Sequence, residues 1–535
     1  MVLILHRYIF RELLKVFLPA SIGLTLILSL GSILAPVQEY GVGPRQVLSL
    51  MTYFLPITLT FVLPMAALFA SALVYGRFAS DNELEACRAS GVSLLALVYP
   101  GLTLAIVVAI ANLILSFHML PYFVHLAEKS LQGDAKQILF RNIQRRGHYE
   151  LPTDAPWLIY ADEVNLKNDT LIGVVVAGVE GAGIGSIYTA ERATVKFNAH
   201  DTFNEVQIIA NNTFQIGADD DGGFSVEQGA INTEFGSLLA DDIKFKKINE
   251  MKKIRADLML FRPVEKLAHD TYAQFTTELL AQEIKAKTGA DANSYYGLYS
   301  GEKLVEFRAD SVLADEEKVK LEGRIEVVES NPGVGSTRAV LRPTKASLHI
   351  EGNKLAPTLT MDLYNVLEEG SGNLRMRHVI RGLFPKDNAD NIDIGKRFGA
   401  QNVLDSLRLA SDSAILKEGP SARLKNLTDS LEWKIQKTLL QIRAEIHTRL
   451  VFGIGCVPMI LIGIGIGIMK KGGHLLTAFG ASCIPAAVLI VCIISGRQIT
   501  QNADVTIISG VTLIWSGLVF LLLLVGAIYH RLLKN

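Results

Sequence analysis

The chain begins and ends with long apolar runs that carry no charge, and a charged, turn-rich stretch separates these two ends. A helix of about 20 apolar residues is long enough to cross the ~30 Å hydrocarbon core of a bilayer. The apolar runs therefore predict six membrane-spanning helices, three before the charged stretch and three after it. They are expected at about residues 16–37, 47–75, 94–117, 450–469, 475–495 and 505–529.

The long stretch between the two apolar ends has the pattern of a mainly β region. Short β-branched and aromatic runs alternate there with clusters of Gly, Asn and Asp, which is typical of antiparallel strands and their turns. We expect two β units, each an open sandwich or jelly-roll-like, at about 150–260 and 300–400, with helices at 264–287 and 421–449.

The predicted fold class is an integral membrane α-helical protein with six spans and a large inserted, mainly-β region. The predicted domains are an N-terminal membrane half (1–117), the inserted region (118–449) and a C-terminal membrane half (450–535).

A short polar segment, residues 76–91, interrupts the apolar pattern between the second and third spans. Ser80 with Glu83 three residues later resembles a capping box, and Gly91 is a natural helix stop. A helix of two to three turns is therefore predicted over about 81–90. Asp81, Glu83 and Glu85 crowd its first turns, where they favour the helix dipole. They either only cap and solubilise this turn, or they make it a docking helix for a partner's arginines.

Basic residues recur near the N-terminus on one predicted helical face. Arg7, Arg11 and Lys15 are spaced i, i+4 and i+8. This spacing predicts either an interfacial helix on an anionic leaflet, turning into the first span near Val16, or a plain positively charged flank of that span. The charge-free run at 16–37 is too long for a typical signal peptide, so a retained span is expected.

Lys and Arg in the short loops predict the orientation of the chain. With the N-terminus inside, the inner segments hold most of these residues, whereas the outer short loops hold only Arg45 and Arg497. The basic inner residues are Arg7, Arg11, Lys15, Arg77, Arg88, Lys470, Lys471, Arg531 and Lys534. Both termini and the 76–91 segment are thus expected in the cytoplasm, and the inserted region is expected on the other side.

Composition excludes several classes of function. The formal net charge of −1 gives no basic domain for nucleic acid. The inserted region contains no cysteine, so no disulfide framework holds it.

Glu445, His447 and Arg449 stand at the entry of the fourth span without further ligands at metal spacing, and we interpret them as an interfacial charged belt. Neither a metal nor another cofactor is predicted, and no catalytic residues are identified.

The glycines at 463 and 467 lie within a predicted span and are not followed by the Lys and Ser or Thr of a phosphate loop. Their spacing favours close helix packing.

The span centres lack charged residues, which disfavours an ion-driven transporter. If the protein is a pump, its energy must therefore come from another chain.

Three segments together resemble the LptF/LptG permease family. They are Arg7-Tyr-Ile-Phe-Arg-Glu-Leu-Leu-Lys15, Asp81-Asn-Glu-Leu-Glu-Ala-Cys-Arg-Ala-Ser-Gly91 and Arg443-Ala-Glu-Ile-His-Thr-Arg449, the last entering a span that contains Pro and Gly. The three-plus-three spans add to the resemblance. It covers both membrane ends and about 100 residues of the β region.

The resemblance implies a permease subunit of the lipopolysaccharide-export ABC transporter in the bacterial inner membrane. Two permeases, paralogous or identical, would take the lipid from the outer leaflet of that membrane and pass it to periplasmic β-jelly-roll domains. A cytoplasmic ATPase dimer would dock on the 80–91 helix. Its expected contacts are Asp81, Glu83, Leu84, Glu85, Arg88 and Gly91, with Glu83 at the position of the family's acidic docking residue.

Two features depart from the family pattern. The outer end of the first span lacks the usual basic residues, which leaves Arg45 as the candidate contact for lipid phosphate. The inserted region is about twice the usual length, and its part after about residue 300 weakly resembles the periplasmic bridge proteins of the same pathway. The rival functions are another ABC-type lipid or lipoprotein permease, with one span before the insert and three after it, and a membrane-anchored β scaffold without transport activity.

Overall fold

A computed structural model describes most of the chain. The described residues are 2–40, 44–133, 135–151, 157–165, 168–180, 183–199, 204–217, 224–235, 242–288, 294–300, 303–315, 318–330, 338–351, 358–369, 374–385, 419–469, 475–501 and 507–534. The chain forms two compact units. One combines Met1–Met251 with Leu439–Asn535, and the other is Lys252–Thr438.

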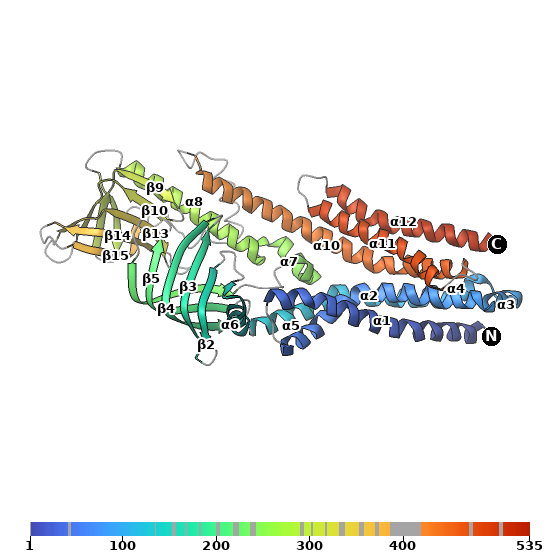
Figure 1. The fold of residues 1–535 in the computed structure, drawn as a ribbon. Coiled ribbons are helices and arrows are strands. Elements are labelled where there is room, and N and C mark those ends of the chain that lie inside the picture. The colour runs from blue at the N-terminus through green and yellow to red at the C-terminus, as the bar shows by residue number, and fades with distance from the viewer. Residues whose placement is uncertain are drawn as a thin grey trace. The chain divides into compact units, whose positions relative to one another are not determined.

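The first unit contains the apolar helices (Figure 1). Its N-terminal helices are α1 (Val2–Tyr40), α2 (Pro44–Ser80), α3 (Glu83–Ala89), α4 (Leu94–Ile114), a π-helical turn η1 (Leu115–Met119), α5 (Leu120–Gly133) and α6 (Ala135–Arg146). The C-terminal helices of the chain are α10 (Ala422–Met469), α11 (Leu475–Gln501) and α12 (Ile507–Lys534). Among the described residues, six helices are long and apolar enough to span a membrane, three before the β-rich region and three after it. The predicted fold class is confirmed.

The N-terminal segment differs from the prediction because α1 runs without a break from Val2 to Tyr40. A separate interfacial helix turning near Val16 is therefore wrong. Ile9, Leu13 and Phe17 are buried on one face of α1. This apolar stripe packs against other helices both before and after Val16, so nothing favours a turn there.

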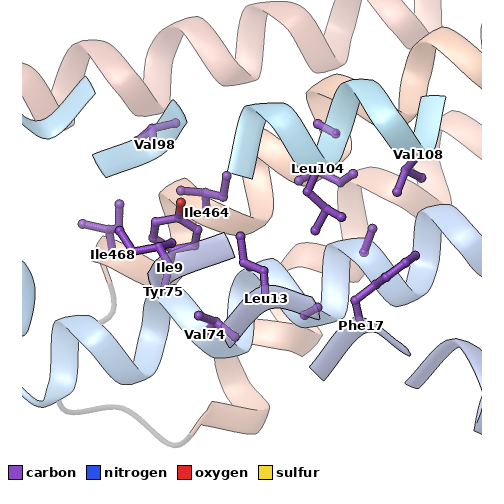
Figure 2. Packing of buried hydrophobic residues seen from close by; sticks show 14 of the residues in the cluster. Ile9, Leu13, Phe17, Val74, Tyr75, Val98, Leu104, Val108, Ile464 and Ile468 are labelled. Atoms are coloured by element: carbon purple, nitrogen blue, oxygen red, sulfur yellow. The ribbon is translucent and has the colours of Figure 1, made fainter. Parts of the chain in front are cut away.

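A single apolar cluster joins α1, α2, α4 and α10 (Figure 2). Its members interleave at the spacing of helical faces. They include Ile9, Leu13, Phe17, Val74, Tyr75, Val98, Leu104, Val108, Ile464 and Ile468. The one polar tip in this group, the Tyr75 hydroxyl, donates to the Leu97 carbonyl at 2.9 Å. The cluster thus ties both membrane ends of the sequence into one helical bundle.

The first unit also carries a six-stranded antiparallel sheet in which each strand pairs with the next along the chain. The strands are β1 (His148–Glu150), β2 (Trp157–Asn165), β3 (Thr170–Glu180), β4 (Gly183–Ala199), β5 (Asn204–Gly217) and β6 (Phe224–Phe235). Helix α6 packs against β1 and β2. Ile138, Leu139 and Ile143 of α6 share one core with Leu171 and Val174 of β3.

The chain then leaves the sheet through short helices rather than further strands. They are the 3-10 turn η2 (Ile243–Phe245), α7 (Ile248–Ala256) and the 3-10 turn η3 (Leu258–Leu260). The β unit predicted up to about 260 is therefore too long at its end.

The second unit pairs helix α8 (Arg262–Thr288) with a nine-stranded antiparallel sheet. In sheet order the strands are β12 (Arg338–Arg342), β11 (Glu326–Ser330), β8 (Lys303–Arg308), β7 (Tyr296–Ser300), β15 (Leu374–Pro385), β14 (Thr358–Glu368), β13 (Lys345–Glu351), β10 (Lys318–Glu322) and β9 (Ser311–Asp315). Leu280 and Ile284 of α8 share a core with strand residues such as Phe307. Helix α8 lies over the predicted 264–287 helix, and α10 begins at Ala422 and includes the predicted 421–449 helix except its first residue. Residues 386–400 of the predicted unit lie outside the described residues.

Candidate functional site

The polar segment between α2 and α4 forms a tight, structured turn with a short helix in it. Helix α2 runs to Ser80, and the Asp81 N–H closes its last turn on the Arg77 carbonyl at 2.8 Å. Asn82 then adopts the left-handed conformation at φ +59°, and α3 begins at Glu83.

The predicted capping box is therefore wrong. Ser80 is the last residue of α2, and Asn82, which precedes α3, makes no side-chain cap. The reason lies in tertiary packing: Phe78 and Ala79 are buried in the helical cluster, so α2 continues past its last long apolar run. Asp81 consequently lies in the turn before α3.

The predicted stop at Gly91 is confirmed. Gly91 has φ +85° and its N–H donates to the Arg88 carbonyl at 2.9 Å, while the Val92 N–H donates to the Cys87 carbonyl at 3.1 Å. This pair of bonds is a Schellman motif, which favours glycine at the left-handed position. Ser93 then caps α4 by accepting the Ala96 N–H at 3.3 Å.

Helix α3 has one buried anchor and a charged outer surface. Leu84 is only 5 % exposed and belongs to the same apolar cluster as Phe78 and Leu94. The predicted charged contacts are all exposed; they are Asp81, Glu83, Glu85 and Arg88. The segment thus exposes three carboxylates to solvent, while Leu84 anchors it to the helical bundle.

Helix α1 is tied to this segment by an ion pair. Glu12 of α1 accepts from Arg77 of α2 at 2.8 Å and from Lys15 at 2.5 Å. Beside this pair the Tyr8 ring stacks on the Phe78 ring, with centroids 5.8 Å apart. The polar segment is therefore braced from α1 as well as from α2.

The basic residues predicted at the N-terminus are exposed. Arg7, Arg11 and Lys15 lie along the solvent-accessible side of α1, opposite the buried stripe. Arg45 falls within the first turns of α2, but its side chain lies outside the described residues.

The charged residues at the entry of the fourth span form a buried cluster rather than an exposed belt. Arg449 is 3 % exposed; it donates to Glu445 at 2.9 Å and to the Lys244 and Lys246 carbonyls at 2.6 and 3.3 Å. Arg497 of α11 lies 3.6 Å from the second Glu445 oxygen. The interpretation of Glu445 and Arg449 as an interfacial belt is wrong, because the η2 turn covers them.

Residues 7–262 match the family described as "Lipopolysaccharide export system permease LptF/LptG". The matched range contains the polar segment, α3 and the whole first sheet. Over these residues, just under half of the chain, the sequence belongs to the LptF/LptG permease family. No match was found among curated proteins.

Membership of this family gives the chain a coarse function. The LptF/LptG proteins are permeases of lipopolysaccharide export, which makes the chain a transport subunit. Together with its six apolar helices, membership identifies the chain as a multi-pass inner-membrane protein that belongs to an ABC transporter with partner subunits.

Two charged residues of this permease were not identified from its sequence as structural contacts. Glu12 is the one acidic residue within residues 1–15, and its i+3 spacing to Lys15 is the local signal for a contact. Its link to Arg77, 65 positions away, had no local signal.

Across the described part of the permease, no group of three or more His, Cys, Asp and Glu side chains is arranged to hold a metal ion.

Proposed function

We propose that this permease works with a second permease subunit, itself or a paralogue, and with a cytoplasmic ATPase dimer. Together they would extract lipopolysaccharide or a related lipid from the inner membrane and pass it to periplasmic β domains. The observation that carries the proposal is the family match, because it spans the docking segment, the surrounding helices and the first sheet in one continuous range.

The proposed docking contact is the outer surface of α3. Exposed carboxylates on a short helix attract arginines, and such charge-assisted bonds are among the stronger polar contacts. Glu83 is the proposed main contact, with Asp81, Glu85 and Arg88 around it. Leu84 holds the segment from beneath, and Gly91 forms the turn at its C-terminal end.

The proposed orientation follows the distribution of Lys and Arg in the short loops. It puts both termini and α3 in the cytoplasm, where an ATPase could reach them, and the inserted β region in the periplasm. The exposed Arg7, Arg11 and Lys15 then face the anionic headgroups of the inner leaflet, where each adds about 1 kcal/mol of attraction.

The proposed lipid path leads outward from the bundle to the β region. Arg45 is the candidate contact for a lipid phosphate. The first sheet, which shares a core with Leu50 of α2, would receive the lipid. The second sheet would act as a built-in counterpart of a periplasmic bridge protein, or meet such a protein as a partner. Its strand content over 296–385 supports this role.

The docking proposal is tested by charge reversal in the full-length protein. Glu83→Arg should lower the amount of ATPase that co-purifies with the permease at least ten-fold, because it replaces an attraction with a like-charge repulsion. Glu163→Arg, an equally exposed reversal on β2, is the matched control and should retain the ATPase. Retention of the ATPase by Glu83→Arg at the control level would overturn the docking assignment.

The rivals differ in observable ways. A lipoprotein-type permease with one span before its insert does not fit the three-plus-three arrangement of apolar helices. A membrane-anchored β scaffold without transport activity requires no ATPase partner. If the wild-type protein captures no ATPase at all, the scaffold function is favoured.

A further inference from the structure

The ion pair between Glu12 and Arg77 links the N-terminal part of α1 to the end of α2. Arg77 acts at two levels there. Its carbonyl accepts the Asp81 N–H at 2.8 Å in the last turn of the helix, while its guanidinium holds Glu12 at 2.8 Å. Arg77 thus contacts the turn before α3 through its carbonyl and contacts Glu12 of α1 through its side chain.

Helix α3 cannot keep its own orientation. It has seven residues, whereas isolated helices shorter than about 12–15 residues are marginal in water. Its placement therefore depends on Leu84 beneath it and on the turns at its two ends. The Gly91 Schellman motif closes the C-terminal turn. The N-terminal turn begins at Asp81, whose N–H donates to the Arg77 carbonyl.

The surroundings of the pair make it more than a loose surface contact. The Glu12 side chain is 13 % exposed and that of Arg77 is 40 % exposed. The Arg77 guanidinium lies 5.5 Å from the Phe78 ring centre, and Tyr8 of α1 stacks on the same ring. An ion pair beside packed rings loses less to solvent screening than one that is fully surrounded by water.

We propose that Glu12 is a positioning residue for the docking helix, acting through Arg77. Helix α1 then supports α3 indirectly, because Glu12 holds the Arg77 side chain at the end of α2, from which α3 continues. The inference rests on the proposed docking function of α3. It goes beyond that function by assigning a role to a residue of α1 that need not touch the ATPase.

The orientation of α3 can be measured without any ATPase. A spin label is placed at the exposed Ala89→Cys in full-length protein whose four natural cysteines are replaced by alanine, and its mobility is read from the line shape in nanodiscs. Glu12→Gln and Arg77→Gln should both increase the mobility of the label. Arg77→Lys, which keeps the charge, and Lys15→Gln, which leaves the Glu12–Arg77 pair intact, should keep the wild-type spectrum. If a variant instead destabilised the whole helical bundle, its thermal stability and its yield would fall as well.

A second readout is the affinity for the ATPase. Glu12→Gln should weaken it about two- to five-fold, as expected for the loss of one ion pair that holds the docking orientation. An unchanged line shape in Glu12→Gln, or a change equal to that in Lys15→Gln, overturns the positioning role even where Glu83→Arg abolishes docking. A mobile label in Glu12→Gln together with full ATPase capture by Glu83→Arg would instead support the brace and overturn the docking function.

Discussion

At the level of single residues, α10 and α2 approach each other closely where they cross. A Cβ at Gly467 would lie 2.8 Å from the Ala72 carbonyl oxygen and 3.0 Å from the Gly76 nitrogen. A Cβ at Gly463 would meet the Leu68 carbonyl oxygen at 3.0 Å. Because these neighbours are backbone atoms, they cannot move aside as a flexible side chain would. Glycine at both positions sets the distance between the two helices.

Substitution at Gly467 should therefore separate the helices. We expect Gly467→Val to destabilise the protein by about 1–3 kcal/mol, the usual range for overpacking a well-packed core. Gly526→Ala on α12, where a Cβ meets nothing within 4 Å, is the matched control. It should be neutral or stabilising by up to about 1 kcal/mol through helix propensity. Thermal unfolding in detergent measures both; equal midpoints would contradict the packing account.

Arg449 provides a second prediction at this scale. Arg449→Leu leaves Glu445 buried with only the more distant Arg497, so a loss of about 3–5 kcal/mol is expected. Arg443→Leu, exposed on the same helix, should change stability by less than about 0.5 kcal/mol. In the double variant Glu445→Leu/Arg449→Leu the loss should be smaller than in Arg449→Leu, since no lone charge remains. A double variant that is worse than Arg449→Leu would contradict this explanation.

These two sites differ in how far the sequence predicts them. Gly463 and Gly467 have the spacing of a helix-packing face inside an apolar run, and this local pattern was enough. Arg449 has only its i−4 spacing to Glu445 as a local pattern, because its other hydrogen-bond partners are the carbonyls of Lys244 and Lys246, about 200 positions earlier. Burial of a charge depends on what the fold brings to it, and only the structure shows that.

At the level of elements, the ends of helices were harder to predict than their existence. The Gly91 stop depends on one glycine and its backbone conformation, so it was predictable. The start of α3 was not, because burial of Phe78 and Ala79 extends α2 and takes Ser80 out of the cap. The sequence predictions include no helix at α6, although Ile138, Leu139 and Ile143 recur at helical spacing and share a core with the first sheet.

The element-scale prediction concerns the anchor of α3. Leu84→Ala removes the only side chain of this helix that is buried and should cost about 2 kcal/mol or more, as for other core leucines. Hydrogen exchange over residues 83–92 should then be faster and ATPase capture should fall, although every charge remains. Leu84→Met conserves volume and serves as the control. Wild-type exchange in Leu84→Ala would show that Leu84 does not hold the helix.

At the level of the whole molecule, two observations fit together. The polar segment between α2 and α4 displays acidic residues on a fastened helix, and the family match covers this segment, the surrounding helices and the first sheet. Three apolar helices on each side of the β-rich region were predictable because hydrophobic length alone defines a span. The unusual second sheet was predicted as a β unit from its alternation, whereas its nine-stranded order depends on long-range pairing that no local pattern fixes.

The central claim is that this permease moves a lipid only when an ATPase acts through α3. The most direct measurement is release of labelled lipopolysaccharide from proteoliposomes that contain the permease, its partner permease subunit and the ATPase. The account predicts release that requires ATP in the wild type and is reduced at least ten-fold by Glu83→Arg, with Glu163→Arg unaffected. Release that proceeds without ATP, or that Glu83→Arg leaves at the wild-type rate, would contradict it.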